Sequence, residues 1–181
     1  RPARSVVTSF YGIYFTGLST KANITRNRIT NPFGGAPNST SAAYGIYFSS
    51  TDALSQLENV VSNNLIYNFT GKGDAYGIYN SGSDNVWYFH NTIAVDGTST
   101  NATTYTATGF YQTTKADGVE LVNNLIAITR GGGGSKYAVY FNTTTGTIHA
   151  NNNIYFLSAI GGTSFTGFYT AKRSTLLDWQ T

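Results

Sequence analysis

Hydrophobic and polar positions alternate in a short segment that recurs along the chain, in which a small residue precedes a large apolar residue and an aromatic one. The small residue is Gly12, Gly45, Gly77, Gly109, Ala138 and Gly167, at intervals of 29 to 33 residues. Each unit also contains a short apolar run followed by Asn-x-Ile or a close variant, as in "VVSNNLI" (60–66) and "VELVNNLI" (119–126). A period near 30 residues predicts a repeat architecture.

Two strands in each unit, polar turns and no helical periodicity favour coils that stack through parallel strands about 4.8 Å apart. A propeller blade needs about 40 residues and four antiparallel strands. A leucine-rich repeat needs Leu at fixed spacing, which the chain lacks. We therefore predict an all-β fold, a parallel β-helix of about five to six coils of about 30 residues, without substantial helix. Residues 1–181 form a single domain in this prediction, with coils beginning near 11, 44, 76, 108, 137 and 167.

The succession of GIY and NN-x-I segments over about residues 11–169 resembles the parallel β-helix repeats of the pectate-lyase-like superfamily. The resemblance implies a right-handed β-helix with an asparagine ladder, in which each side-chain amide bonds to the next coil at a tight bend. Asparagine suits such a bend because it tolerates the left-handed backbone conformation and can satisfy turn amides. The matching residues are Asn27, Asn64, Asn91, Asn124 and Asn153.

Strict alternation along the first strand of each unit predicts two columns of side chains. The interior column is Ile13, Ile46, Ile78, Phe110, Val139 and Phe168, and the second strand adds Ile24, Val61, Tyr88 and Leu121, then Ile29, Ile66, Ile93 and Ile126. The outer column is Tyr14, Tyr47, Tyr79, Tyr111, Tyr140 and Tyr169, with the repeated glycines on the same face.

Two interpretations of the tyrosines stay open at this point. In the first, they form a cross-strand ladder that only stabilises the sheet, by about 0.2–1 kcal/mol for each pair. In the second, Tyr14, Tyr47, Tyr79, Tyr111 and Tyr140 form a flat aromatic strip on which sugar rings stack.

The amino-acid composition argues against nucleic acid and membranes as binding partners. Charged residues make up only 10% of the chain, which contains 20 Gly and 14 Tyr, so the predicted surface is polar but weakly charged. The net charge of +3 is small and its basic residues are scattered, which argues against nucleic acid. No apolar run approaches the roughly 18 residues of a membrane-spanning helix, so we expect no membrane insertion.

Candidate chemistry is sparse. The eight carboxylates include one aligned pair, Asp84 and Asp117, and both lie in turn-forming sequences. Three or more carboxylates on one coil face would instead favour an enzyme. The two histidines, His90 and His149, fall two coils apart without a cysteine nearby. We therefore predict no catalytic residue, no metal and no cofactor. "RGGGGS" (130–135) lacks the ending of a phosphate loop, and we expect a flexible loop there.

The ends of the chain suggest a larger context. "STLLDWQT" (174–181) resembles the "TLADWQ" segment of very large, repetitive cell-surface proteins of bacteria in the Bacteroidetes group. We see no helix that could cover a terminal coil, so we expect a segment of a longer solenoid, with adjoining domains or coils at both ends. Long loops, such as those between 30 and 43 and between 94 and 107, share one side of the coils.

We therefore interpret the chain as a non-enzymatic, structural or adhesin-like segment of a bacterial secreted or cell-surface protein, located outside the cell. It displays loops and the aromatic strip toward glycans or another cell-surface protein. Two alternatives remain. One is the scaffold of a polysaccharide-active enzyme, a lyase or a hydrolase. The other is a non-catalytic carbohydrate-binding module that uses Tyr47, Tyr79 and Tyr111.

Overall fold

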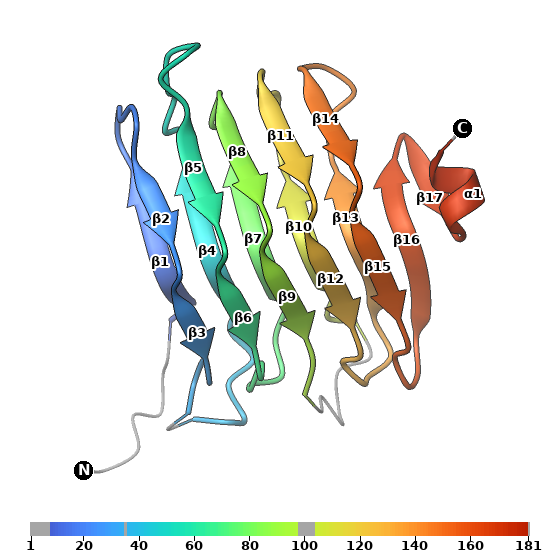
Figure 1. Cartoon of the computed structure of the whole chain (residues 1–181). Helices are drawn as coiled ribbons and strands as arrows, with labels where there is room; N and C mark the ends of the chain where they lie inside the picture. Colours follow the sequence, from blue (N-terminus) through green and yellow to red (C-terminus); the bar gives the residue numbers. More distant parts are fainter. Residues whose placement is uncertain (1–7, 35, 98–103, 181) are drawn as a thin grey trace.

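The computed structural model describes residues 8–34, 36–97 and 104–180 of the chain. These residues form a parallel β-solenoid, which confirms the predicted all-β fold and the absence of substantial helix. Figure 1 shows the coils side by side along the axis, from the blue N-terminal coil to the red C-terminal segment. Each complete coil contains three strands rather than the two that the sequence pattern predicted, because the bend at the asparagine divides the second strand.

The strands form three sheets that run the length of the stack. Sheet A contains β1 (Phe10–Thr16), β4 (Ala43–Ser49), β7 (Ala75–Ser81), β10 (Ala107–Gln112), β13 (Ser135–Phe141), β16 (Thr163–Tyr169) and β17 (Ala171–Arg173). Sheet B contains β2 (Asn23–Thr25), β5 (Asn59–Ser62), β8 (Val86–Phe89), β11 (Val119–Val122) and β14 (Ile148–Asn151). Sheet C contains β3 (Arg28–Thr30), β6 (Leu65–Tyr67), β9 (Thr92–Val95), β12 (Leu125–Ile128) and β15 (Ile154–Leu157).

The interior is a continuous apolar core between the three sheets. The columns predicted for the second strand of each unit are buried, as are the inward residues of β4, β7, β10 and β13. Tyr88 is the largest fully buried side chain, and its ring lies 5.0 Å from that of Phe110 in an edge-to-face arrangement. Core positions therefore differ in size from coil to coil while the interior stays filled.

The repeated glycine faces the interior, contrary to the prediction from strict alternation. In β4, Gly45 and Ile46 are both buried, and the register with β7 passes from Tyr44 directly to Ile46. A Cβ on Gly45 would lie 2.6 Å from Cγ2 of Ile66, so only glycine allows sheet C to approach sheet A this closely. Because two consecutive residues point inward, the aromatic residues on both sides of the pair, Tyr44 and Tyr47, point outward.

The last strand of the repeat, β16, is offset by one residue from the predicted alignment. Phe168 pairs with Tyr140, not with Val139, and it stacks on that ring instead of entering the core. Tyr169 consequently lies outside the tyrosine column in which it was predicted. The two outward aromatic residues, Phe165 and Phe168, are three positions apart, as in the other coils. Gly167, however, pairs with Val139 and not with Ala138, which holds the glycine position in the preceding coil.

The five asparagines lie at the corner between sheets B and C. The side-chain amides of the first four donate to Oδ1 of the asparagine in the next coil at 2.9–3.0 Å, and that oxygen also accepts a backbone N–H. The left-handed backbone conformation belongs to the residue before each asparagine, with φ between 54° and 59°. These residues are Arg26, Asn63, His90, Asn123 and Asn152. The expectation that the ladder asparagine itself takes this conformation is therefore wrong by one residue.

The C-terminal segment departs from the repeat. β17 pairs antiparallel with β16, and one helical turn, α1 (Leu176–Trp179), follows. Thr175 begins the helix with a capping box to Asp178. The Trp179 ring lies 5.5 Å from that of Phe141 and packs against the core, so this end carries a partial cover that we did not predict. Among the described residues, no helix is long and apolar enough to cross a membrane.

Candidate functional site

Two rows of aromatic side chains cover the outer face of sheet A. Each of the six parallel strands of this sheet contributes one residue to each row, because the inward pair lies between them. Column 1 consists of Tyr11, Tyr44, Tyr76, Thr108, Tyr137 and Phe165. Column 2 consists of Tyr14, Tyr47, Tyr79, Tyr111, Tyr140 and Phe168. The five tyrosines of the predicted strip all lie in column 2, whereas column 1 was missed. We call the two columns together the tyrosine face.

The rings of the tyrosine face are packed in a regular pattern. Within column 2, successive ring centroids are 4.4–5.2 Å apart and the ring planes differ by at most 19°. Between the columns the rings meet edge to face, as in Tyr44 and Tyr47, at 5.1 Å and 89°. Both arrangements are favourable for aromatic pairs. The repeat of the coils therefore fixes a herringbone of rings along the axis of the solenoid.

Column 2 and the first half of column 1 remain in contact with solvent. In the first coil, Tyr11 is 41% exposed and Tyr14 is 51% exposed, and the later tyrosines of column 2 are half-buried. The second half of column 1, from Thr108 through Tyr137 to Phe165, is buried. Burial by neighbouring rings, followed by the proximity of Tyr11, raises the pKa of Tyr44 to about 12. Burial also raises the pKa of Tyr79. These hydroxyls therefore stay protonated at neutral pH and present both an apolar ring and a hydrogen-bonding group.

Column 1 lacks a ring in the fourth coil, where Thr108 stands between Tyr76 and Tyr137. A cavity of about 330 Å³ opens at this point. Its lining combines aromatic rings, hydroxyl groups and one carboxylate, from Asp74, Tyr76, Thr104, Thr106, Thr108, Tyr111, Ser135, Tyr137 and Tyr140. The backbone N–H and the hydroxyl of Thr106 both donate to Oδ1 of Asp74, at 2.7 and 3.2 Å.

Carboxylates also align at the turn between sheets A and B, where three occur rather than the predicted two. The N–H of Asp84 donates to Oδ1 of Asp52 at 3.1 Å, and that of Asp117 donates to Oδ1 of Asp84 at 2.7 Å. A hydrogen bond from Lys115 lowers the pKa of Asp117. The hydrogen bonds support the predicted turn role. By the expectation from the sequence, three carboxylates on one coil face nevertheless favour an enzyme, so an enzyme is a second candidate function.

The histidines contribute little to a site. Nδ1 of His149 lies 2.8 Å from Oε2 of Glu120 on the outer face of sheet B, and both side chains are solvent-accessible. His90 occupies the left-handed position before Asn91. In the part of the chain that the structure describes, no group of three or more His, Cys, Asp or Glu residues is arranged to hold a metal ion.

Two cations are buried near the glycine-rich loop and were not predicted. The Nζ of Lys136 donates to the carbonyl oxygens of Gly134 and Gly161, both at 2.8 Å, and contacts that of Gly132. Arg130 donates to the carbonyl oxygens of Gly71 and Gly73, two coils earlier. Loss of hydration lowers the pKa of both side chains. The 130–135 segment is therefore fixed by hydrogen bonds around Lys136, unlike the flexible loop that we expected.

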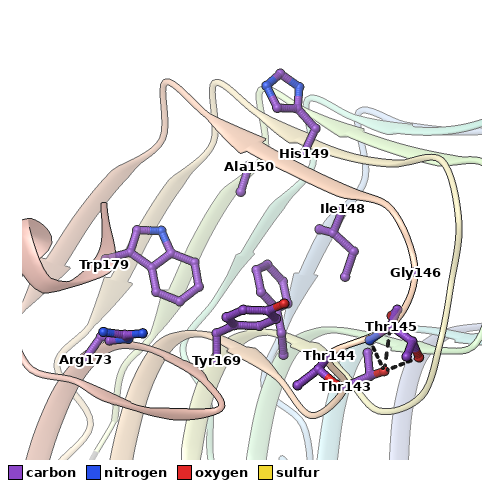
Figure 2. Close-up of a pocket in the computed structure, with 11 residues that line it drawn as sticks. Thr143, Thr144, Thr145, Gly146, Ile148, His149, Ala150, Tyr169, Arg173 and Trp179 are labelled. Carbon is purple, nitrogen blue, oxygen red and sulfur yellow. Dashed lines mark hydrogen bonds between the residues drawn. The ribbon is translucent and has the colours of Figure 1, made fainter. Parts of the chain in front are cut away.

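A second cavity, of about 430 Å³, lies at the C-terminal end of the stack. Figure 2 shows the Trp179 ring and the Arg173 side chain on one side of it and the 143–145 turn on the other. His149 points away from the cavity in this view. The lining contains Arg173 but no carboxylate among the residues that the structure describes, and aromatic rings do not repeat there. The tyrosine face therefore provides the more regular surface for recognition.

A spacing rule in the sequence could have revealed column 1. Aromatic residues three positions apart occur in five of the six strands, as in Tyr44 and Tyr47 or Phe165 and Phe168. Strict alternation would place two aromatic residues that are three positions apart on opposite faces of the sheet. The glycine between them indicates where two consecutive residues face inward, so that both aromatic residues face outward. No protein-family model, curated protein or solved structure matched this chain.

Proposed function

We propose that this chain is a non-enzymatic β-helical segment that binds glycans through the tyrosine face. The observation that carries the proposal is column 2, a continuous row of stacked, solvent-accessible rings across six neighbouring strands. In this proposal the solenoid is a rigid support that holds the rings at a fixed spacing. Because the rings are already ordered, ligand binding does not have to order them and loses little side-chain entropy. The regular coil repeat then matches a ligand that is itself a linear polymer.

Sugar rings and the tyrosine face have complementary chemistry. A pyranose ring has an apolar face of C–H groups and a rim of hydroxyl groups. The tyrosine rings offer apolar surface, and a row of small hydroxyl side chains runs beside column 2. Ser49 and Ser81 occupy equivalent positions two residues after Tyr47 and Tyr79, and the next coil adds Thr113, whose hydroxyl lies 3.4 Å from that of Ser81. Such a surface binds neutral glycans without requiring charge.

The wider context of the proposal is a secreted or cell-surface bacterial protein of the pectate-lyase-like β-helix type. The weakly charged, hydroxyl-rich composition and the sequence of the C-terminal segment support this placement. An adhesin-like role follows, in which the stacked coils hold the tyrosine face toward a glycan or another cell-surface protein. Labelling of intact bacteria with a membrane-impermeant reagent should modify the protein, and protection until lysis would contradict the location.

Glycan-array screening tests the binding function. We compare the wild-type protein with Tyr79→Ala/Tyr111→Ala, which removes two neighbouring rings of column 2. Trp87→Ala is the matched control, because it removes an aromatic ring from the outer face of sheet B. We expect the tyrosine variant to lose most of the wild-type signal and the control to keep it. Equal binding by all three proteins, or no wild-type binding to any glycan, would reject the function.

A polysaccharide-active enzyme is the second candidate, favoured by the aligned carboxylates of Asp52, Asp84 and Asp117. Release of reducing or unsaturated ends from neutral and acidic polysaccharides is the test, with Asp84→Asn/Asp117→Asn as the variant. Cleavage by the wild type that the variant lacks would favour the enzyme. We expect no cleavage by either, because the turn backbone uses one oxygen of Asp52 and one of Asp84.

A further inference from the structure

The gap in column 1 has a defined shape. Strand spacing places Tyr76 and Tyr137 about 9.6 Å apart along the axis, two steps of about 4.8 Å, with Thr108 at the base between them. Thr108 is only 1% exposed, so it forms a floor beneath the neighbouring rings. The cavity of about 330 Å³ therefore occupies the place that a sixth aromatic ring would take in the column.

Polar groups border the gap on the side of the strand starts. Asp74 and Thr106 precede β7 and β10, and Thr106 holds the carboxylate through its N–H and its hydroxyl. Both hydrogen bonds use Oδ1. Ser135 begins β13 and adds another hydroxyl to the lining. A ligand ring in the gap thus meets aromatic surface on its faces and hydrogen-bonding groups at its edge.

From this arrangement we propose that the gap is a subsite for one pyranose ring of a neutral glycan, with Asp74 accepting hydrogen bonds from the sugar hydroxyls. This inference rests on the proposed glycan-binding function. It identifies the gap as the part of the tyrosine face that selects among glycans. A carboxylate at the wall repels acidic sugars, because a uronate would bring a second negative charge into a partly desolvated site. The subsite therefore distinguishes neutral glycans from polyuronates.

An organic cation is the main competing ligand, since aromatic rings and a carboxylate also bind quaternary ammonium groups. The hydroxyl lining favours the sugar. Thr104, Thr106 and Ser135 offer hydrogen bonds that a quaternary ammonium group cannot use, whereas a pyranose carries a hydroxyl on most of its carbons. The gap is also bounded on opposite sides by Tyr76 and Tyr137, which suits a disc-shaped ligand.

Two variants test the subsite. Thr108→Tyr restores the residue type of the neighbouring coils and fills the gap, while Thr108→Ser keeps the gap open as a control. We titrate each protein with mannohexaose, cellohexaose, hexagalacturonate and choline in a calorimeter. Wild type and Thr108→Ser should bind a neutral hexasaccharide, and Thr108→Tyr should bind it about tenfold more weakly or worse. Asp74→Asn should reduce the preference for neutral over acidic hexasaccharide by about tenfold. This second variant tests the subsite independently if Thr108→Tyr misfolds.

The outcomes separate this inference from the proposed function. If Tyr79→Ala/Tyr111→Ala abolishes binding while Thr108→Tyr and Asp74→Asn bind as the wild type does, the tyrosine face binds glycans and the subsite is wrong. If the wild type binds no glycan on the array and neither neutral hexasaccharide, both fail. Binding of choline in preference to the hexasaccharides, lost in Asp74→Asn, would also overturn the subsite.

Discussion

The Cγ2 methyl of Ile66 packs against Gly45, and a Cβ on that glycine would lie 2.6 Å from it. This contact brings sheet C against sheet A directly beneath the inward pair, Gly45 and Ile46, which separates the two aromatic columns. In the fifth coil the glycine is replaced by Ala138, and the isoleucine position is held by Tyr155, which has no β-branched methyl group. The inward pair is kept there, because Ala138 and Val139 are both buried, so alanine can take the place of glycine where the isoleucine is absent.

Gly45→Ala should destabilise the protein by about 1–3 kcal/mol, because the added methyl group overlaps both Ile66 and the Gly77 carbonyl oxygen. Urea unfolding measures the change in the free energy of unfolding. Gly131→Ala is the matched control, since its nearest atom would lie at an ordinary 3.6 Å. We expect the control to stay within about 0.5 kcal/mol of the wild type. An equal effect of the two substitutions would contradict the close approach at Gly45.

Asn91→Ala should cost about 3 kcal/mol, because Asn91 is buried and links the coils on both sides of it. The substitution leaves the N–H of Asn64 and the carbonyl oxygen of Val61 without their partner. Asn27→Ala, at the first step of the ladder, removes fewer bonds from a more exposed position and should cost about 1 kcal/mol. Equal losses of unfolding free energy for the two variants would contradict the prediction that an asparagine bonded to both neighbouring coils contributes more than one at the end of the ladder.

Alkaline pH should unfold the protein through the tyrosine face. The pKa of Tyr44 is about 12 in the folded state against an ordinary value of 10.0, so folding holds the phenolic proton more tightly. The stabilisation is complete below pH 10 and is lost as the pH rises toward 12. Tyrosinate absorbance and circular dichroism, followed together, should show late ionisation that coincides with unfolding, and Tyr44→Phe should reduce the loss. Ionisation of all tyrosines near pH 10 with the fold intact would contradict this coupling.

Thr108→Tyr should stabilise the protein even as it blocks the proposed subsite. The new ring can stack on Tyr76 and Tyr137, and aromatic pairs contribute about 0.5–1.5 kcal/mol each. Partial rearrangement at the cavity floor reduces this gain, so we expect about 1 kcal/mol in urea unfolding. Thr108→Ser should be close to neutral. A destabilised Thr108→Tyr would mean that the gap cannot hold a tyrosine ring and would argue against its ring-sized shape.

The solenoid could be predicted from the sequence because its determinants are periodic. The Asn-x-Ile segments and the aromatic strands recur near every 30 residues, and each repeat must bury its apolar side against the next. The interior positions of Val61 and Leu121 follow directly from that periodicity. These positions are set by local strand geometry and need no information about distant contacts.

The details of the candidate site could not be predicted in the same way. Column 1 depends on a break in strict alternation, at Gly45 and Ile46 in one coil and at Ala138 and Val139 in another, which the period-2 rule does not predict. The role of Asp74 depends on a loop that brings it beside Thr106 of the next coil. From its residue type alone, Lys136 would be expected on the surface. In the structure, glycine carbonyl oxygens from two coils surround its ammonium group. In each case the decisive neighbour lies in another strand or loop that is distant in the sequence.

The decisive test of glycan binding by the tyrosine face is an NMR titration of the isotope-labelled protein with the glycan that it binds best on the array. We expect shift changes only on the outer face of sheet A, centred on the rings of Tyr79, Tyr111 and Tyr137. Trp87 and His149, on the outer face of sheet B, should not respond. Shift changes centred on sheet B, or on the Asp84 and Asp117 turn, would contradict the tyrosine face as the binding surface.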